Sequence, residues 1–81
     1  MKIEYLVKMA NEVGAFFATE PDAEQAANAV AGHLRRFWEP RMRAQIMAHQ
    51  ATGGAGLSDL ALKAVAKLAA ETAGAVPQGP P

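Results

Sequence analysis

The stretch that decides the fold of this 81-residue chain is "GHLRRFWEPRMRAQI", residues 32–46. Pro40 lies near its middle. Proline has no backbone N–H to donate and disfavours helical geometry in the residue before it, so a single helix cannot run unbroken through this stretch. The prediction is a corner or kink at Pro40, between a helix that ends at about Trp38 and another over residues 40–51.

Upstream of this corner, apolar residues recur at helical spacing, with a turn between two runs. The first run predicts a helix over residues 2–18. The segment "ATEPDAEQ" then breaks and restarts the chain, and either Thr19 or Asp22 caps the helix that ends at about Trp38. No strand pattern appears anywhere in the sequence.

Downstream of the corner, "TGGAGLS" at residues 52–58 predicts a flexible connection, which we interpret as a hinge. Ser58 is a suitable cap for a last helix over residues 59–73. The chain ends in "GAVPQGPP", whose prolines and glycines predict a disordered or flexible tail at residues 74–81. The sequence therefore predicts an all-α protein, a small bundle of three to four short helices in one domain at residues 1–73.

The same spacing predicts which residues the helices bury. Gly14 costs its helix about 1 kcal/mol against alanine, which suggests that another helix approaches closely there. Leu57 is expected to pack against Leu62 at the start of the last helix. The expected buried faces consist of Ile3, Leu6, Val7, Ala10, Gly14 and Phe17 in the first helix, Ala23, Ala26, Ala27, Val30, Leu34 and Phe37 in the second, and Leu62, Val65, Leu68 and Ala69 in the last.

The composition excludes several classes of protein. Without cysteine, the chain has no disulfide scaffold, thiolate metal site or cysteine nucleophile. Its formal net charge is +0, which argues against a nucleic-acid binder that uses the charge of the whole molecule. No apolar stretch is long enough to span a membrane, and Glu4, Lys8 and Glu12 interrupt any secretory pattern. A cytoplasmic protein is therefore expected.

The sequence offers no catalytic, cofactor-binding or metal-binding set. Its only histidines, His33 and His49, are separated by a spacing that matches no helical metal site, and no nearby carboxylate completes a ligand set. Both are expected to be structural. The glycines of "GGAG" lack the preceding strand and the lysine that a phosphate-binding loop requires. The chain is therefore not expected to be an enzyme by itself.

The first helix carries more apolar surface than one buried face needs. Tyr5, Met9 and Phe16 form a second stripe beside the first, and Met47 lies apart from the apolar face of its own helix. A tight bundle that buries all of this surface is one interpretation. The alternative, which we favour, is that part of the surface meets another protein, because exposed methionine and aromatic residues are typical of interfaces.

The corner concentrates arginine. Arg35 and Arg36 fall in the last turn of one helix, where positive charge is favourable, whereas Arg41 and Arg43 fall at the start of the next, where it is not. The counter-charge of Arg41 and Arg43 is expected from Glu39, from the acidic residues 20–24, or from an acidic or carbonyl-rich partner surface.

Trp38 lies between the two arginine pairs. Arginine and tryptophan are typical anchors of protein interfaces, so Trp38 is either such an anchor or the centre of the small core. Binding of nucleic acid by the arginines is a weaker alternative, because no recognisable nucleic-acid motif accompanies them.

Three segments resemble a known family. They are "YLVKMANEVGAFF" at residues 5–17, "AGHLRRFWEPRMRAQI" at residues 31–46 and "GGAGLS" at residues 53–58. Together they are similar to the delta subunit of NAD-dependent, molybdenum-containing formate dehydrogenase, most specifically in "HLRRFWEPRMR". The resemblance covers roughly residues 1–62 and leaves the last helix and the tail largely outside it.

The resemblance implies a small accessory subunit of a soluble bacterial enzyme that oxidises formate to carbon dioxide and passes electrons to NAD. It implies that this chain holds no cofactor and that the partner subunits carry the molybdenum bis-pterin, iron–sulfur clusters and flavin. The implied role is binding to the large catalytic subunit and support of assembly or stability. The residues expected to meet that partner are Tyr5, Met9, Phe16, Arg35, Arg36, Trp38, Arg41, Arg43 and Met47.

Two other functions stay open on the sequence alone. A transient chaperone for assembly or cofactor insertion would use the same surfaces as a permanent subunit. A small helical nucleic-acid-binding module is the third candidate, and its binding would weaken steeply with salt. Self-association of the isolated chain also stays open, because exposed apolar stripes can meet each other.

Overall fold

The computed structural model of the chain describes residues 2–75 and contains four α-helices in that range. They are α1 (Ile3–Phe17), α2 (Ala23–Phe37), α3 (Pro40–Ala51) and α4 (Asp59–Ala75). No strand occurs among the described residues. The predicted all-α class is confirmed. Wherever the sequence predicted a helix boundary, the observed boundary lies within two residues of it.

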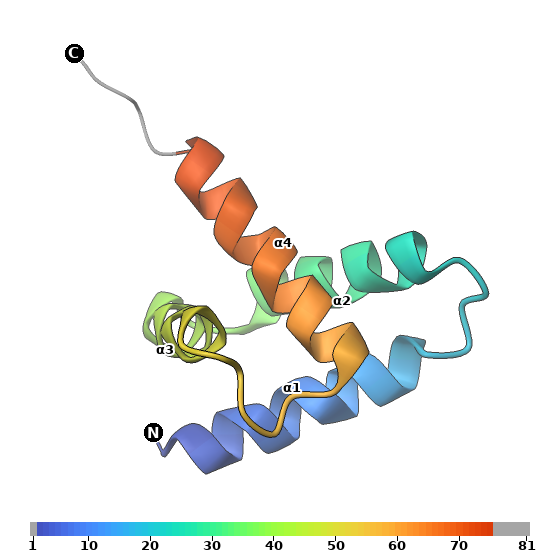
Figure 1. Cartoon of the computed structure of the whole chain (residues 1–81). Coiled ribbons are helices and arrows are strands. Elements are labelled where there is room, and N and C mark those ends of the chain that lie inside the picture. The colour runs from blue at the N-terminus through green and yellow to red at the C-terminus, as the bar shows by residue number, and fades with distance from the viewer. Residues whose placement is uncertain (1, 76–81) are drawn as a thin grey trace.

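The four helices pack into a small bundle in which α2 and α4 share the most extensive contact (Figure 1). Figure 1 shows α4 crossing α2, and α3 lying at the opposite side of the bundle from the α1–α2 turn. α1 packs against all three other helices. Only Trp38 and Glu39 connect α2 to α3, so the corner between these helices is set within two residues.

The core is built largely from small side chains, with a few large ones between them. Alanines contribute to it from α1, α2 and α4, which lets the helices approach closely. On α4 the buried face includes Ala61 and Ala64, which the predicted face left out. The core residues are Leu6, Ala10, Ala27, Val30, Ala31, Leu34, Trp38, Ile46, Leu57, Ala61, Ala64, Val65 and Leu68.

The prediction that Phe37 and Ala23 lie on the buried face of α2 is wrong. Phe37 is 69% exposed, and Ala23, the first residue of the helix, is exposed as well. Trp38 follows Leu34 by four residues and therefore takes the inward position at the end of the helix. With that position filled by the larger ring, Phe37 is directed outward.

Side-chain caps fix the starts of two helices. Of the two candidates for α2, Asp22 is the cap: its Oδ1 accepts from Glu24 N at 2.9 Å and from Gln25 N at 3.4 Å. At α4, Ser58 Oγ accepts from Ala61 N at 3.2 Å, as predicted. Each cap satisfies N–H groups that have no partner within the helix.

The loop before α4 is held more firmly than the predicted flexible hinge. Asn11 of α1 donates from Nδ2 to Gly56 O and accepts at Oδ1 from Ser58 N, both at 2.9 Å. His49 Nε2 lies 2.8 Å from Ala55 O on the other side. Gly56 has φ +86°, a conformation that favours glycine. The loop is therefore a shaped turn that α1 and α3 hold from two sides.

At the other end, α4 continues to Ala75 and so includes the first two residues of the predicted tail at 74–81. The rest of that prediction, residues 76–81, lies outside the described residues.

Candidate protein-interaction surface

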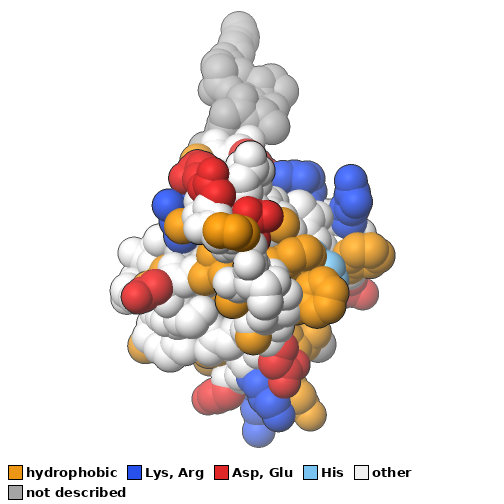
Figure 2. Space-filling model, turned by 90° about the vertical axis from the view of Figure 1, so that its right-hand side faces the viewer, with side chains coloured by type: hydrophobic (Ala, Val, Ile, Leu, Met, Phe, Trp, Pro, Cys, Tyr) orange, Lys and Arg blue, Asp and Glu red, His pale blue; other side chains and the backbone are white. Residues whose placement is uncertain are grey.

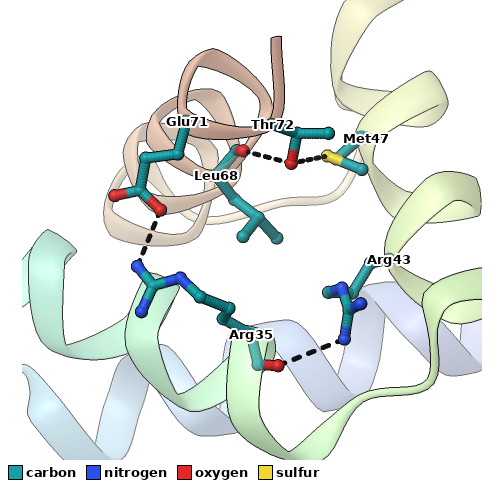
Figure 3. Close-up of polar contacts among 6 residues, drawn as sticks. All are labelled: Arg35, Arg43, Met47, Leu68, Glu71 and Thr72. Atoms are coloured by element: carbon teal, nitrogen blue, oxygen red, sulfur yellow. Dashed lines mark hydrogen bonds and ion pairs between the residues drawn. The ribbon is translucent and has the colours of Figure 1, made fainter. Parts of the chain in front are cut away.

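Arg43 acts within the chain, at the corner between α2 and α3 (Figure 3). Its Nη1 donates to the backbone oxygen of Arg35 at 3.1 Å and to that of Trp38. These oxygens lie at the C-terminal end of α2, where carbonyl groups lack partners inside the helix. The counter-charge of Arg43 is therefore the negative end of α2. Neither Glu39 nor an acidic residue at 20–24 forms an ion pair with Arg43 in the described chain.

Arg35 is also bound within the chain. Its Nη2 lies 2.7 Å from Glu71 Oε1, which links α2 to α4 (Figure 3). Both side chains are about half exposed, with relative areas of 51% and 46%. Solvent screens such a pair, so it stabilises the fold by about 1 kcal/mol at most.

Arg36 and Arg41 differ from the other two arginines. Both side chains are exposed, and neither has an ion pair or a hydrogen bond with any residue in the range 2–75. They lie on opposite sides of the Pro40 corner, one in the last turn of α2 and the other in the first turn of α3. The arginine cluster thus divides into an internal pair and an external pair.

Trp38 was expected to be either an interface anchor or the centre of the core, and the structure places it in the core. Trp38 is 5% exposed and packs in the main hydrophobic cluster. Met47 is partly buried between α3 and α4, where Thr72 Oγ1 lies 3.9 Å from its sulfur (Figure 3). Neither side chain offers a partner as much surface as an outward-facing residue does.

The exposed apolar surface centres on four rings that run from α1 across to α2, which we call the aromatic ridge: Phe16, Phe17, His33 and Phe37. Neighbouring ring centroids are 5.0 Å apart from Phe16 to Phe17, 6.3 Å from Phe17 to His33, and 4.8 Å from His33 to Phe37. Such edge-on and tilted contacts are favourable for aromatic rings. Both ends of the ridge face outward, because Phe16 is 76% exposed and Phe37 is 69% exposed.

A hollow lies on each side of the Phe17–His33 pair. The first, which we call the apolar groove, has a volume of about 360 Å³ and is lined by Met9, Glu12, Val13, Phe16, Phe17, His33 and Trp38. The second, the basic hollow, is lined by Phe17, Asn28, Ala29, Gly32, His33, Arg35, Arg36 and Phe37. Figure 2 shows hydrophobic side chains gathered around a histidine, with basic side chains close by.

The structure therefore brings together only part of the predicted partner-binding set. Met9, Phe16 and the mostly buried Trp38 line the apolar groove, and Arg35 and Arg36 line the basic hollow. Tyr5 is 64% exposed on α1 but lines neither. Arg41 lies in the first turn of α3 and also lines neither. Whether these residues contact a partner stays a prediction.

The predicted partner-binding set lacks four members of this surface, namely Phe37, Phe17, His33 and Glu12. The sequence pattern placed the two phenylalanines on buried faces and indicated a structural role for His33. A signal was present in the spacing of His33 and Phe37, which lie four residues apart and so on one side of α2. The contact of that side with Phe17 could not be read from periodicity, because it depends on how α1 and α2 pack.

The opposite end of α2 carries a charge cluster of a structural kind. Glu24 forms ion pairs with Lys63 at 3.3 Å and with Lys67, so that α4 is tied to the start of α2. Hydrogen bonds from Lys67 and Lys63 to the carboxylate hold the pKa of Glu24 below its ordinary value of 4.5. Desolvation opposes this shift only weakly, since the carboxylate is exposed. The lowered pKa thus reports two surface ion pairs.

Within residues 2–75, histidine, aspartate and glutamate side chains nowhere gather in a group of three or more that could hold a metal ion. In the same range, each helix is too short or too polar to cross a membrane.

The family model of the NADH-dependent formate dehydrogenase delta subunit FdsD matches residues 5–65, which include most of α1, all of α2 and α3, and the start of α4. Comparisons with curated proteins and with solved structures give no match. The family match includes the corner with its arginines and the aromatic ridge. The chain therefore belongs to the formate dehydrogenase delta subunit family, and so to the subunits of a larger enzyme that has further chains.

Proposed function

We propose that this chain is a non-catalytic accessory subunit that binds the large catalytic subunit of an NADH-dependent formate dehydrogenase and supports assembly or stability of the complex. Membership of the delta subunit family supports the choice of formate dehydrogenase as the enzyme to which the chain belongs. Under this proposal, the molybdenum bis-pterin, iron–sulfur clusters and flavin belong to the partner subunits, and formate oxidation takes place there.

The observation that carries the proposal is the aromatic ridge. A fold with so few large core residues leaves Phe16 and Phe37 mostly in solvent, although burying either ring would stabilise the chain by about 1.5–3 kcal/mol. Exposed aromatic rings that contact one another beside an unpaired arginine are typical of a surface that meets another protein.

Affinity purification of the tagged chain from its native host tests this function. The measurements are the stoichiometry of the recovered subunits, their cofactor content and formate-dependent reduction of NAD. We expect recovery of the active enzyme with this chain in a fixed ratio to the large subunit. Recovery only with a cofactor-free large subunit would identify a transient chaperone instead. Recovery without any formate dehydrogenase subunit would refute the proposal.

A further inference from the structure

The two hollows beside the Phe17–His33 pair carry opposite charges. Glu12 lines the apolar groove on one side, and Arg36 lines the basic hollow on the other. Both side chains are exposed. The surface is therefore an apolar centre with a negative group on one side and a positive group on the other.

Neither charge is used within the described chain. Glu12 and Arg36 form no ion pair with any residue in the range 2–75. Five other charged side chains form ion pairs across helices in this range: Glu24 pairs with Lys63 and Lys67 of α4, and Arg35 pairs with Glu71. The charges that flank the aromatic ridge are thus left free to bind groups outside the fold.

The wall between the hollows contains an unsatisfied polar atom. His33 Nδ1 is buried and has no hydrogen-bond partner among the described residues. Buried polar atoms in folded proteins are paired in the large majority of cases. His33 lines both hollows, so this nitrogen is a polar atom of their shared wall that the described chain leaves without a partner.

We propose that the apolar groove and the basic hollow together receive one amphipathic helix of the large catalytic subunit. That helix places a large apolar side chain in the groove beside Phe16, an acidic side chain against Arg36, and a basic side chain towards Glu12. The inference rests on the proposed function. The inference extends that function by assigning one face of the chain to the contact with the large subunit and by stating the chemistry of the segment that covers this face.

A helix is the segment that this surface fits best. The groove lies along α1 and the end of α2, and the described residues offer no strand edge to which an extended peptide could add. A docked helix repeats its side chains every three to four residues, so one apolar anchor and two flanking charges are within its reach. The order of the two charges then fixes the direction in which the helix lies.

Binding of the large subunit by groove variants tests the inference. The full chain is co-expressed with that subunit, and the apparent Kd of the pair is measured for Phe16→Ala, Arg36→Glu and Glu12→Lys. Phe16→Ala removes an anchor ring and is expected to weaken binding about thirtyfold, the usual effect at an interface hot spot. The matched controls are Lys8→Glu and Glu4→Lys, which reverse exposed charges of α1 outside both hollows and are expected to bind like the wild type.

A photoreactive phenylalanine analogue at position 16 identifies the segment. We expect it to crosslink to a helix of the large subunit that has an acidic side chain within one turn of the apolar anchor. Circular dichroism of each variant checks that the helices are intact. If the wild type binds the large subunit but the groove variants bind equally well, or if the crosslink joins two copies of this chain, the inference fails while the proposed function stands. If the wild type does not bind that subunit, the proposed function fails first.

Discussion

Replacing Arg43 with methionine is expected to destabilise the isolated chain strongly, although this residue lies at the surface of α3. Methionine keeps the volume of the side-chain stem but has no guanidinium group. The change therefore removes the hydrogen bonds from Nη1 to the backbone oxygens of Arg35 and Trp38. It also removes a positive charge from the negative end of α2.

The magnitude follows from these contacts. A hydrogen bond to a charged group contributes about 1.5–3 kcal/mol. The bond to Trp38 O is partly buried and keeps most of that value, whereas the bond to Arg35 O is exposed and keeps little. A cation near a helix C-terminus adds about 0.3–1 kcal/mol. Arg43→Met is therefore expected to lower the free energy of unfolding by about 2–3 kcal/mol, and Tm by about 10–20 °C in a domain of this size.

Chemical and thermal unfolding followed by circular dichroism measure this loss. Arg41→Met is the matched control, because Arg41 lies two residues away on the same helix and has no partner in the described chain. It is expected to change the free energy of unfolding by less than about 0.5 kcal/mol. Equal losses for the two variants would show that the corner does not depend on capping of α2 by Arg43, and the reasoning would be wrong.

Three further changes have defined outcomes. Gly14→Ala is expected to raise the free energy of unfolding by about 0.5–1 kcal/mol, because an added Cβ would lie 3.7 Å from Ser58 Oγ, an ordinary contact; a lower Tm would contradict this. Asn11→Ala is expected to lower the free energy of unfolding by about 2 kcal/mol, because two hydrogen bonds to the loop are lost. Unchanged hydrogen exchange at the Ser58 N–H would contradict this. The ion pairs that lower the pKa of Glu24 stabilise the fold fully above pH 4.5. Their contribution to the free energy of unfolding is lost as the pH falls through the folded-state pKa. Glu24→Gln is expected to reduce the loss of stability in that acidic range, and an NMR titration that gave Glu24 its ordinary pKa would contradict the argument.

Much of the fold could be predicted because the helix signals are local. Pro40 ends one helix and starts the next, and the caps at Asp22 and Ser58 lie where short polar side chains precede apolar runs. The inward turn of Trp38 in place of Phe37 could not be read in this way. Either ring suits the spacing of α2, and the packing of α3 and α4 around the corner decides between them.

The candidate site was predictable only in part. An excess of apolar surface on α1 could be counted from Met9 and Phe16, and the unusual arginine content was visible in the sequence. Which arginines are internal depends on the turn at Pro40, which brings Arg43 back onto α2. Contacts such as that between Phe17 and His33 join different helices, so no single segment encodes them.

The extensive contact between α2 and α4 also has a consequence for the order of events during synthesis. Arg35 and Glu71 are 36 residues apart in the chain, and Glu24 and Lys67 are 43 residues apart. The ribosome therefore releases α2 well before the helix that covers it, and the nascent chain exposes the core face of α2 until α4 emerges. A chaperone or a partner subunit that meets the chain before α4 emerges would therefore meet it with that face uncovered. A polypeptide truncated after residue 65, where the family match ends, would retain the matched segments. It would lose Leu68 from the core and Glu71 from the α2–α4 contact.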